Sequence, residues 1–186
     1  MKKEIIKNRH RLINQSSIIL VSCQLASLKN IITVGWYQII DINPILVGIS
    51  IGQDRYSHRI IKESRVFGIN VPLTDIIEKV WCCGKTSGKD TDKFIHCNLS
   101  FFYGHYKNLP LINECPGNIE CRLTRFIDFK SHTLFIGEVK AAYVEEEYYD
   151  GYWIPEKTNL IFPFHLGGDY ILESTPVRKK VEFKKE

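Results

Sequence analysis

Residues 119–146, IECRLTRFIDFKSHTLFIGEVKAAYVEE, predict a β-hairpin that decides the fold class. Residues 119–128 and 132–146 carry alternating or continuous β-type side chains, and Lys130-Ser131-His132 forms the connection between them. A connection this short cannot join parallel strands, which need a crossover of a dozen or more residues. The hairpin therefore argues against a parallel sheet.

The rest of the chain adds short strands and a few helices. Runs of β-type residues between turn signals predict strands at residues 17–24, 31–38, 45–51, 66–71 and 100–105. A helix is predicted at residues 56–63, and a second one follows Thr74 as its N-cap, with an apolar stripe of Ile76, Ile77, Val80 and Trp81. Residues 159–170 are apolar but interrupted by Pro163 and Gly167-Gly168. This pattern favours a mainly β (α+β) barrel.

Length and charge predict one domain, residues 1–186, with basic tails at about residues 1–11 and 178–186. A chain of 186 residues is long enough for one hydrophobic core. The net charge is +4, but the two tails carry +4 and +3, so the body between them carries about −3. A nucleic-acid-binding face needs clustered positive charge on folded surface. The charge distribution therefore argues against a nucleic-acid partner.

The apolar segments and the cysteines indicate a cytoplasmic protein without a metal site. No apolar run reaches membrane-spanning length, and the charged start leads into no signal segment. We expect the six cysteines to be reduced thiols. The adjacent pair Cys82-Cys83 suits neither a zinc site nor an easy disulfide, and no Cys-x-x-Cys pair is present.

Three polar segments carry the candidate chemistry. In residues 30–36, NIITVGW, Gly35 has no side chain, so a ligand could approach the backbone closely there. The alternative for this segment is a core strand that contains one glycine. In residues 49–59, ISIGQDRYSHR, hydroxyl, imidazole and guanidinium groups enter a helix, which suits a phosphate. The alternative for this segment is an ordinary solvated turn.

The third segment, residues 82–94, CCGKTSGKDTDKF, is rich in glycine, hydroxyl and lysine groups after a helix. Successive backbone N–H groups in such a loop can hold an anion, although a solvated loop would have a similar composition. The glycine spacing of a phosphate loop is absent from the sequence, which disfavours a nucleoside-triphosphatase.

Together these segments resemble the flavin reductase-like, FMN-binding split-barrel family, and flavoredoxins in particular. The resemblance runs from about residue 17 to residue 144, with a looser similarity to residue 170. It rests on Asn30-x-x-Thr33-Val34-Gly35-Trp36, on Ile49-Ser50-Ile51 with Arg55 and Ser57-His58, on Asn70-Val71-Pro72, on Cys83-Gly84 and Ser87-Gly88 before Asp92-Lys93-Phe94, and on residues 134–139. The turn at residues 40–44 departs from the family, which often has a serine and two prolines there.

The resemblance implies a six-stranded antiparallel split β-barrel with flanking helices, FMN as cofactor and a homodimer. The aromatic residues between Tyr148 and Phe164 also favour a homodimer, because aromatic residues are enriched at protein interfaces. Carried onto this chain, the cofactor-binding residues are Thr33, Val34, Gly35, Trp36, Ser50, Ile51 and Arg55 toward the isoalloxazine, Ser57 and His58 toward the ribityl-phosphate arm, Ser87, Gly88 and Lys93 at the phosphate, His165 in a segment that closes over the cofactor, and Asn30, with no part of FMN assigned to it.

The implied function is that of a flavin reductase or a flavoredoxin-like electron carrier, with NAD(P)H or a redox protein as donor. The sequence contains no Ser/His/Asp signature and no paired carboxylates, so it indicates no catalytic residue. This fits flavin chemistry, which requires no protein nucleophile. Two alternatives stay open: a flavin-binding protein for storage or sensing, and a split-barrel protein for haem or a pyridoxal phosphate-type compound.

Overall fold

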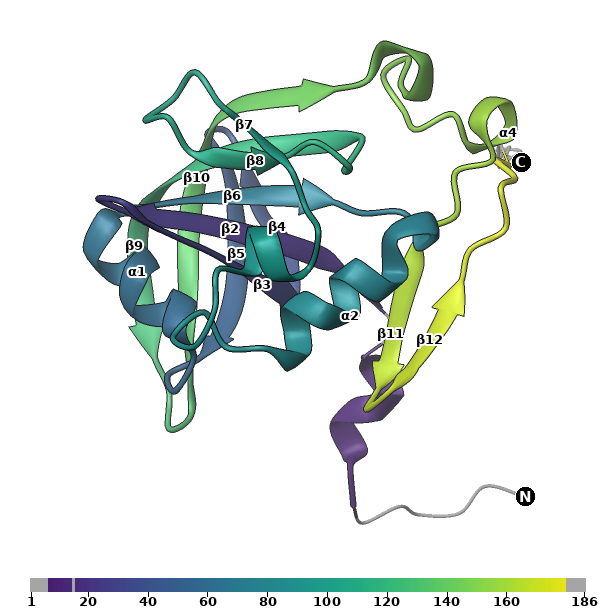
Figure 1. The fold of residues 1–186 in the computed structure, drawn as a ribbon. Helices are drawn as coiled ribbons and strands as arrows, with labels where there is room; N and C mark the ends of the chain where they lie inside the picture. Colours follow the sequence, from purple (N-terminus) through teal and green to yellow (C-terminus); the bar gives the residue numbers. More distant parts are fainter. Residues whose placement is uncertain (1–6, 15, 180–186) are drawn as a thin grey trace.

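The largest element of the computed structural model, which describes residues 7–14 and 16–179, is a seven-stranded antiparallel sheet (Figure 1). In spatial order its strands are β3 (Leu28–Val34), β2 (Ile19–Leu25), β6 (Val66–Val71), β9 (Gly117–Asp128), β10 (His132–Val144), β5 (Ile45–Gly52) and β4 (Tyr37–Ile42). The predicted tails 1–11 and 178–186 are described only from residue 7 and only to residue 179.

The two edge strands of this sheet, β3 and β4, follow each other in the chain. Only Gly35 and Trp36 connect them, so the two edges lie next to each other at that point and the sheet curls into an open barrel. The mainly β, antiparallel split-barrel prediction is thereby confirmed. Seven strands replace the six expected, because the predicted strand 31–38 breaks at Gly35-Trp36 into the ends of β3 and β4.

The predicted hairpin at residues 119–146 forms the longest strand pair, β9 with β10. Its register pairs Thr133 with Asp128 near the turn and Val144 with Gly117 at the far end. Gly137 lies where β10 passes the core, and a Cβ atom there would be 2.5 Å from the ring of Phe67. Only glycine fits this close approach without displacing the ring.

Two apolar clusters lie on the two faces of β2. Ile19, Val21 and Cys23 point into the barrel interior with Phe67 and Phe135, which are both fully buried. Ile18, which precedes the strand, and Leu20 belong to the other cluster, between the sheet and the helices. Because successive side chains of a strand alternate between faces, burial on both sides explains why this strand reads as a continuous apolar run.

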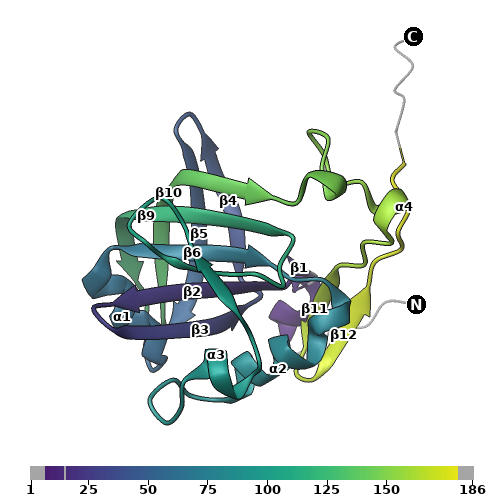
Figure 2. The ribbon, with the colours of Figure 1, turned by 45° about the horizontal axis from the view of Figure 1, so that its top comes forward.

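Helices cover the barrel at two places (Figure 2). Helix α1 (Tyr56–Ser64) packs Ile60 and Ile61 inward and ends at Arg65 in a left-handed conformation, φ 64°. Helices α2 (Ile77–Lys85) and α3 (Lys93–His96) pack over β3. The predicted N-cap role of Thr74 is wrong: Thr74 begins the 3-10 turn η2 (Thr74–Ile76), and α2 starts at Ile77.

Short elements complete the described chain. A three-stranded sheet joins β1 (Ser16–Ser17), β11 (Pro163–Gly167) and β12 (Tyr170–Glu173), and a two-stranded one joins β7 (Phe101–Tyr103) and β8 (Pro110–Ile112). The remaining helical segments are η1 (Arg9–Ile13), η3 (Glu146–Tyr148) and α4 (Pro155–Thr158). Strand β11 places the late apolar segment beside the N-terminal η1 segment (Figure 1).

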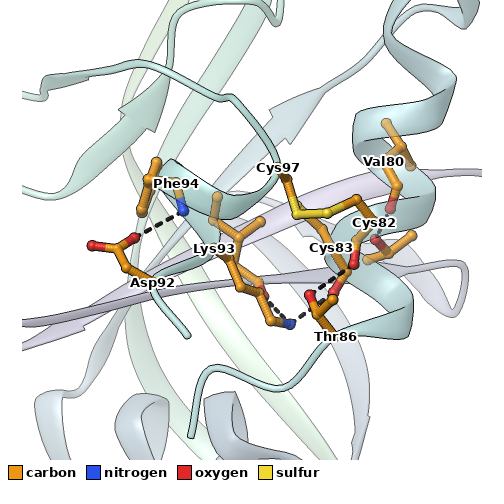
Figure 3. Close-up of a disulfide and its surroundings, with 10 residues drawn as sticks. Val80, Cys82, Cys83, Thr86, Asp92, Lys93, Phe94 and Cys97 are labelled. Carbon is orange, nitrogen blue, oxygen red and sulfur yellow. Dashed lines mark hydrogen bonds between the residues drawn. A yellow bond between two sulfur atoms is a disulfide. The ribbon is translucent and has the colours of Figure 1, made fainter. Parts of the chain in front are cut away.

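One expectation about the cysteines is wrong. Cys82 and Cys97 form a disulfide, with their Cα atoms 5.7 Å apart, while Cys23, Cys83, Cys115 and Cys121 are buried thiols. The pairing arises because the last turn of α2 packs against the end of α3, two segments separated by a loop (Figure 3). Within residues 7–14 and 16–179, no helix is long and apolar enough to cross a membrane.

Candidate functional site: a cavity between the barrel and the α2–α3 loop

A cavity of about 410 Å³ lies where the β3–β4 junction, the β5–α1 loop and the α2–α3 loop meet. Every predicted cofactor-binding residue except His58 lines it. These residues are Asn30, Thr33, Val34, Gly35, Trp36, Ser50, Ile51, Arg55, Ser57, Ser87, Gly88, Lys93 and His165. Segments far apart in the sequence therefore form one site.

The strand wall of the cavity consists of Val34, Gly35 and Trp36, with Asn14 and His165 packed against them. The Ser50 amide donates to the Trp36 carbonyl at 2.9 Å, which continues the β4–β5 ladder up to the cavity. The Gly35 carbonyl accepts from the Ser16 hydroxyl. Backbone groups thus fix this wall, and Gly35 leaves it flat.

A side-chain network supports the strand wall from the N-terminal segment. Trp36 Nε1 donates to Asn14 Oδ1 at 2.6 Å, and Asn14 Nδ2 lies 3.0 Å from His165 Nδ1. His165 Nε2 lies 3.3 Å from the Gly168 carbonyl, which can only accept, so Nε2 is the donor in this contact. His132 packs on the Trp36 ring, with 5.0 Å between the ring centroids.

The loop wall of the cavity consists of Ser87, Gly88 and Lys93, with Asn30 and Ser57 facing them. Asn30 is 1% exposed, and its Nδ2 donates to Ser57 Oγ at 2.8 Å. Its Oδ1 is buried and accepts no hydrogen bond from the described residues. A Cβ atom on Gly88 would lie 2.2 Å from this Oδ1, so the loop backbone passes directly over the amide.

Lys93 is a buried cation at the loop wall, with 4% of its surface exposed. Its Nζ donates to the Ile31 carbonyl at 2.9 Å and to the Cys83 carbonyl at 2.7 Å (Figure 3). Burial lowers the pKa of Lys93 from its ordinary value. An ammonium group has three N–H donors, so one remains beyond these two bonds.

The first turn of α1 brings a second source of positive potential to the loop wall. Arg55, Tyr56 and Ser57 line the cavity at the start of this nine-residue helix, where the N–H groups and the helix dipole favour an anion. The Arg55 guanidinium lies 3.6 Å from Asp54, but both side chains are more than half exposed, which leaves this pair weak.

His58 lies outside the cavity, against the prediction. Its Nε2 lies 2.8 Å from the Thr133 hydroxyl, which in turn donates to Asp128 at 2.6 Å. Burial lowers the pKa of His58, so the ring is neutral near pH 7 and links α1 to β10. Consecutive helix residues point about 100° apart. Ser57 and His58 therefore face different surroundings.

Thr33 lines the cavity, but its hydroxyl already has a partner. Thr33 Oγ1 donates to the Val80 carbonyl at 2.6 Å and so ties β3 to α2. The residue ties a wall strand to α2, and its hydroxyl can only accept a further hydrogen bond.

Several lining residues were not predicted, and seven of them lie inside the three polar segments 30–36, 49–59 and 82–94. The full set is His10, Arg11, Asn14, Ile32, Gly52, Asp54, Tyr56, Cys83, Gly84, Thr86, His132, Gly167 and Gly168. Arg11 sits in the predicted basic tail, and no local signal in the sequence indicates that this tail folds back. The described residues contain no group of three or more His, Cys, Asp or Glu that could hold a metal.

A second cavity, of about 510 Å³, shares Thr33, Gly35, Arg55, Gly84, His165 and Gly168 with the first one. It adds Trp81 and Lys85 from α2, and Lys85 forms an exposed ion pair with Asp169 at 2.7 Å. The two cavities are therefore adjacent. Their arrangement leaves room for a second molecule beside a ligand in the first cavity.

The family model for the flavin reductase like domain matches residues 12–158. A protein of Archaeoglobus fulgidus described as uncharacterized is 34% identical over 110 residues, which are 59% of this chain and 62% of that protein. The chain thus spans less than two thirds of that relative.

Two solved structures resemble the whole chain. Flavoredoxin from Methanosarcina acetivorans is 27% identical with a TM-score of 0.81, covering 97% of this chain and 95% of that one. An FMN-binding protein from Thermus thermophilus, solved with bound p-hydroxybenzaldehyde, has a TM-score of 0.84 at 20% identity, covering 97% and 98% of the two chains. The second likeness shows the fold alone.

Proposed function

Because the chain belongs to the flavin reductase-like family, we propose that its cavity binds FMN and that the protein is a cytoplasmic flavin reductase or flavoredoxin-like oxidoreductase. The observation that carries the proposal is the loop wall. It combines an unpartnered, buried acceptor at Asn30, a cradle that any side chain at residue 88 would fill, and the buried cation Lys93. These groups fit a ligand with both hydroxyl groups and an anion.

Each wall suits one part of FMN. Asn30 Oδ1 would accept from a ribityl hydroxyl, because an amide oxygen without a partner needs a donor. Lys93, Ser57 and the first turn of α1 would hold the phosphate. The flat strand wall at Gly35 and Trp36 would carry the ring. When bound, FMN supplies two-electron transfer, and the residues of the chain bind it, orient it and limit its exposure to water.

The adjacent second cavity favours an oxidoreductase over a storage or sensing protein. A storage site needs only to enclose its ligand, whereas a reaction needs space for a donor or acceptor next to it. Trp81 and Lys85 line this additional space, where the Lys85 ammonium lies over the Trp81 ring, 5.6 Å from its centroid. NAD(P)H or a redox protein is the proposed donor.

The test is an absorbance spectrum of the purified protein, followed by anaerobic addition of NADH and of NADPH. The proposal expects a flavin spectrum that bleaches with one of the nicotinamides or with a reduced redox protein. A flavin spectrum that no donor bleaches would support the storage or sensing alternative. A red-brown haem spectrum, or an apo-protein that binds no added FMN, would contradict the proposal.

We further propose a homodimer that uses the β4–β5 hairpin. Ile39 is 70% exposed and Ile42 is 80% exposed on the edge strand β4, and Ile45 is 49% exposed at the start of β5. An exposed apolar edge strand is a surface that proteins usually cover. The C-terminal aromatics support this less than expected, because Trp153 packs inside the chain on Tyr149 and Phe162.

Light scattering at micromolar concentration tests the dimer. The wild-type protein is expected at twice the chain mass, and Ile42→Glu is expected at the chain mass. Tyr152→Glu is the matched control, since Tyr152 is 75% exposed but lies outside the hairpin. A monomeric wild type would contradict the dimer.

A further inference from the structure

The Cys82–Cys97 disulfide closes the chain segment that forms the loop wall. Cys82 lies in the last turns of α2, and Cys97 follows α3 directly, fifteen residues later (Figure 3). Between them lie cavity-lining residues, namely Cys83, Gly84, Thr86, Ser87, Gly88 and Lys93. One covalent bond therefore joins the two ends of the loop.

Hydrogen bonds connect the disulfide to the groups that would touch the ligand. Lys93 Nζ donates to the carbonyl of Cys83, the neighbour of Cys82, and the Cys97 amide donates to the Lys93 carbonyl at 3.0 Å. Thr86 donates both its amide and its hydroxyl to the Cys82 carbonyl, at 3.1 and 2.8 Å. The position of Lys93 and the start of the loop thus depend on how Cys82 and Cys97 are held.

We propose that this disulfide is a redox switch that controls cofactor affinity. The bonded form holds segment 83–96 closed on the FMN phosphate. Reduction by a dithiol protein of the thioredoxin class loosens the segment and releases FMN. The inference rests on the proposed placement of FMN. In a reducing compartment, protein disulfides are usually transient, catalytic or redox-sensing. The proposed cytoplasmic location therefore favours a regulatory bond.

The exchange chemistry needs only the dithiol. Its thiolate attacks Sγ of Cys82, which is the half-buried partner, and Cys97, 4% exposed, leaves as a thiolate that takes a proton. The second thiol of the reductant then attacks the mixed disulfide and releases the Cys82 thiol. Two electrons and two protons pass to the protein, and the reductant ends as a disulfide.

The neighbouring thiols are unsuited to compete in this exchange. Burial raises the pKa of the Cys83 thiol to about 11, and burial also raises the pKa of Cys115, with Glu114 adding to the effect. Both groups are almost fully protonated near pH 7, and the thiol form is a poor nucleophile. The Cys82–Cys97 pair can therefore open and close without reshuffling to a different partner.

The experiment compares FMN and riboflavin affinities of the full-length apo-protein in two redox states. One sample is oxidised, and the other is treated anaerobically with dithiothreitol and desalted, with thiols counted by Ellman's reagent. Reduction is expected to weaken FMN binding by about tenfold or more, because the loosened segment must be ordered again when the ligand binds. Riboflavin lacks the phosphate, so it does not have to order the segment when it binds. Its affinity is therefore expected to change by less than about threefold on reduction.

Variants separate the disulfide from other thiols. The double variant Cys82→Ser/Cys97→Ser is expected to bind FMN as weakly as the reduced wild type, with no response to dithiothreitol. Cys115→Ala removes a buried thiol of the same apolar cluster and is expected to respond to dithiothreitol as the wild type does.

Four outcomes would overturn the inference. They are six free thiols in the untreated protein, equal FMN affinity in both redox states, an equal loss of FMN and riboflavin affinity, and loss of the near-ultraviolet circular dichroism signal on reduction. The last would mean that the disulfide holds the whole fold. FMN binding by the oxidised protein tests the proposed function separately, since it does not depend on any redox difference.

Discussion

Backbone hydrogen bonds of the main sheet hold the strand wall of the cavity, whereas side chains and one disulfide hold the loop wall. The β4–β5 ladder runs up to Trp36, and Gly35 keeps the surface flat. Across the cavity, Lys93 and Thr86 fasten the loop by donating to carbonyls of α2. Substitutions at the loop wall should weaken FMN binding through the phosphate arm, and substitutions at the strand wall should weaken it through the ring that FMN and riboflavin share. Affinities for FMN and riboflavin separate these effects.

The largest effect is expected for Gly88→Val, which tests whether the loop wall is as tight as the Asn30 contact implies. The new side chain would start 2.2 Å from Asn30 Oδ1 and 3.0 Å from Tyr56, so the amide or the loop must move. Overpacking plus the lost acceptor predicts a loss of FMN affinity of about a hundredfold. Fluorescence titration of apo-protein measures it.

Gly84→Ala is the matched control for this substitution. Its Cβ atom would lie 3.4 Å from Thr33, an ordinary contact, and alanine suits the end of a helix. FMN affinity should stay within about threefold of wild type, given the small cost of such a contact. An equal loss of FMN affinity in both variants would mean that the cavity tolerates no added atom at either position. That result would contradict a specific tight contact between Gly88 and Asn30.

Lys93→Met tests the charge of the loop wall. Removing a charge-assisted bond to phosphate, worth about 1.5–3 kcal/mol, should weaken FMN binding by roughly tenfold to a hundredfold. Two buried carbonyls, of Ile31 and Cys83, lose their donor, which should lower the free energy of unfolding by about 1–3 kcal/mol.

Riboflavin decides how the Lys93 result is read. It should bind Lys93→Met nearly as well as it binds the wild type, because it carries no phosphate. Equal weakening of both ligands would assign Lys93 to the support of α2 and β3 alone. Urea unfolding of both apo-proteins gives the stability difference.

Asn14→Ala tests the strand wall and should have a smaller effect. It removes the partner of Trp36 Nε1 and of His165 Nδ1, and each such bond contributes about 1 kcal/mol. FMN and riboflavin affinities should both fall, by about fivefold each, because this wall faces the ring that the two ligands share. A loss confined to FMN would contradict the assignment of the two walls.

The smallest effect is expected for His58→Gln, because His58 lies outside the cavity and links α1 to β10. FMN affinity should change by less than about twofold, since surface-side changes away from the site are usually small. The depressed pKa of His58 means that its stabilising contribution is present above its unfolded value of 6.5 and is lost as pH falls through the folded value. The midpoint of thermal unfolding should therefore depend less on pH below 6.5 in the variant than in the wild type. An identical pH dependence would contradict this role.

The elements that the sequence predicts well have strong local signals. The strand at residues 66–71 matches β6 at both ends, and the helix at 56–63 matches α1 to within one residue. The break at Gly35-Trp36 was missed because β-type residues continue through it, and only the curl of the sheet requires the chain to change edges there. Periodicity reports burial but does not report sheet closure.

The site could be predicted residue by residue where one segment carries several polar groups in order. Asn30, Ser57, Gly88 and Lys93 belong to such segments, and the cavity brings them together. Asn14 belongs to none, because its role depends on the folding back of an N-terminal segment whose composition is that of a solvated tail.

The disulfide could not be predicted for the same physical reason. Its partners come from two helices whose packing depends on the whole second apolar cluster, and six cysteines allow fifteen full pairings. The family resemblance assigned His58 to the cofactor together with Ser57, but helix geometry turns the side chains of consecutive residues apart, so Ser57 lines the cavity and His58 does not.

The junction of β3 and β4 at Gly35-Trp36 also determines where the barrel can open transiently. The two edge strands are joined covalently at one end only, so opening of the barrel should start at the other end, near Leu28 and Ile42, and decline toward Gly35. Amide hydrogen exchange should follow this gradient, with fast exchange at the distal end of β4 and slow exchange at Val34 and Ser50. The cavity then sits at the fixed end of a moving sheet, where a bound ring is disturbed least.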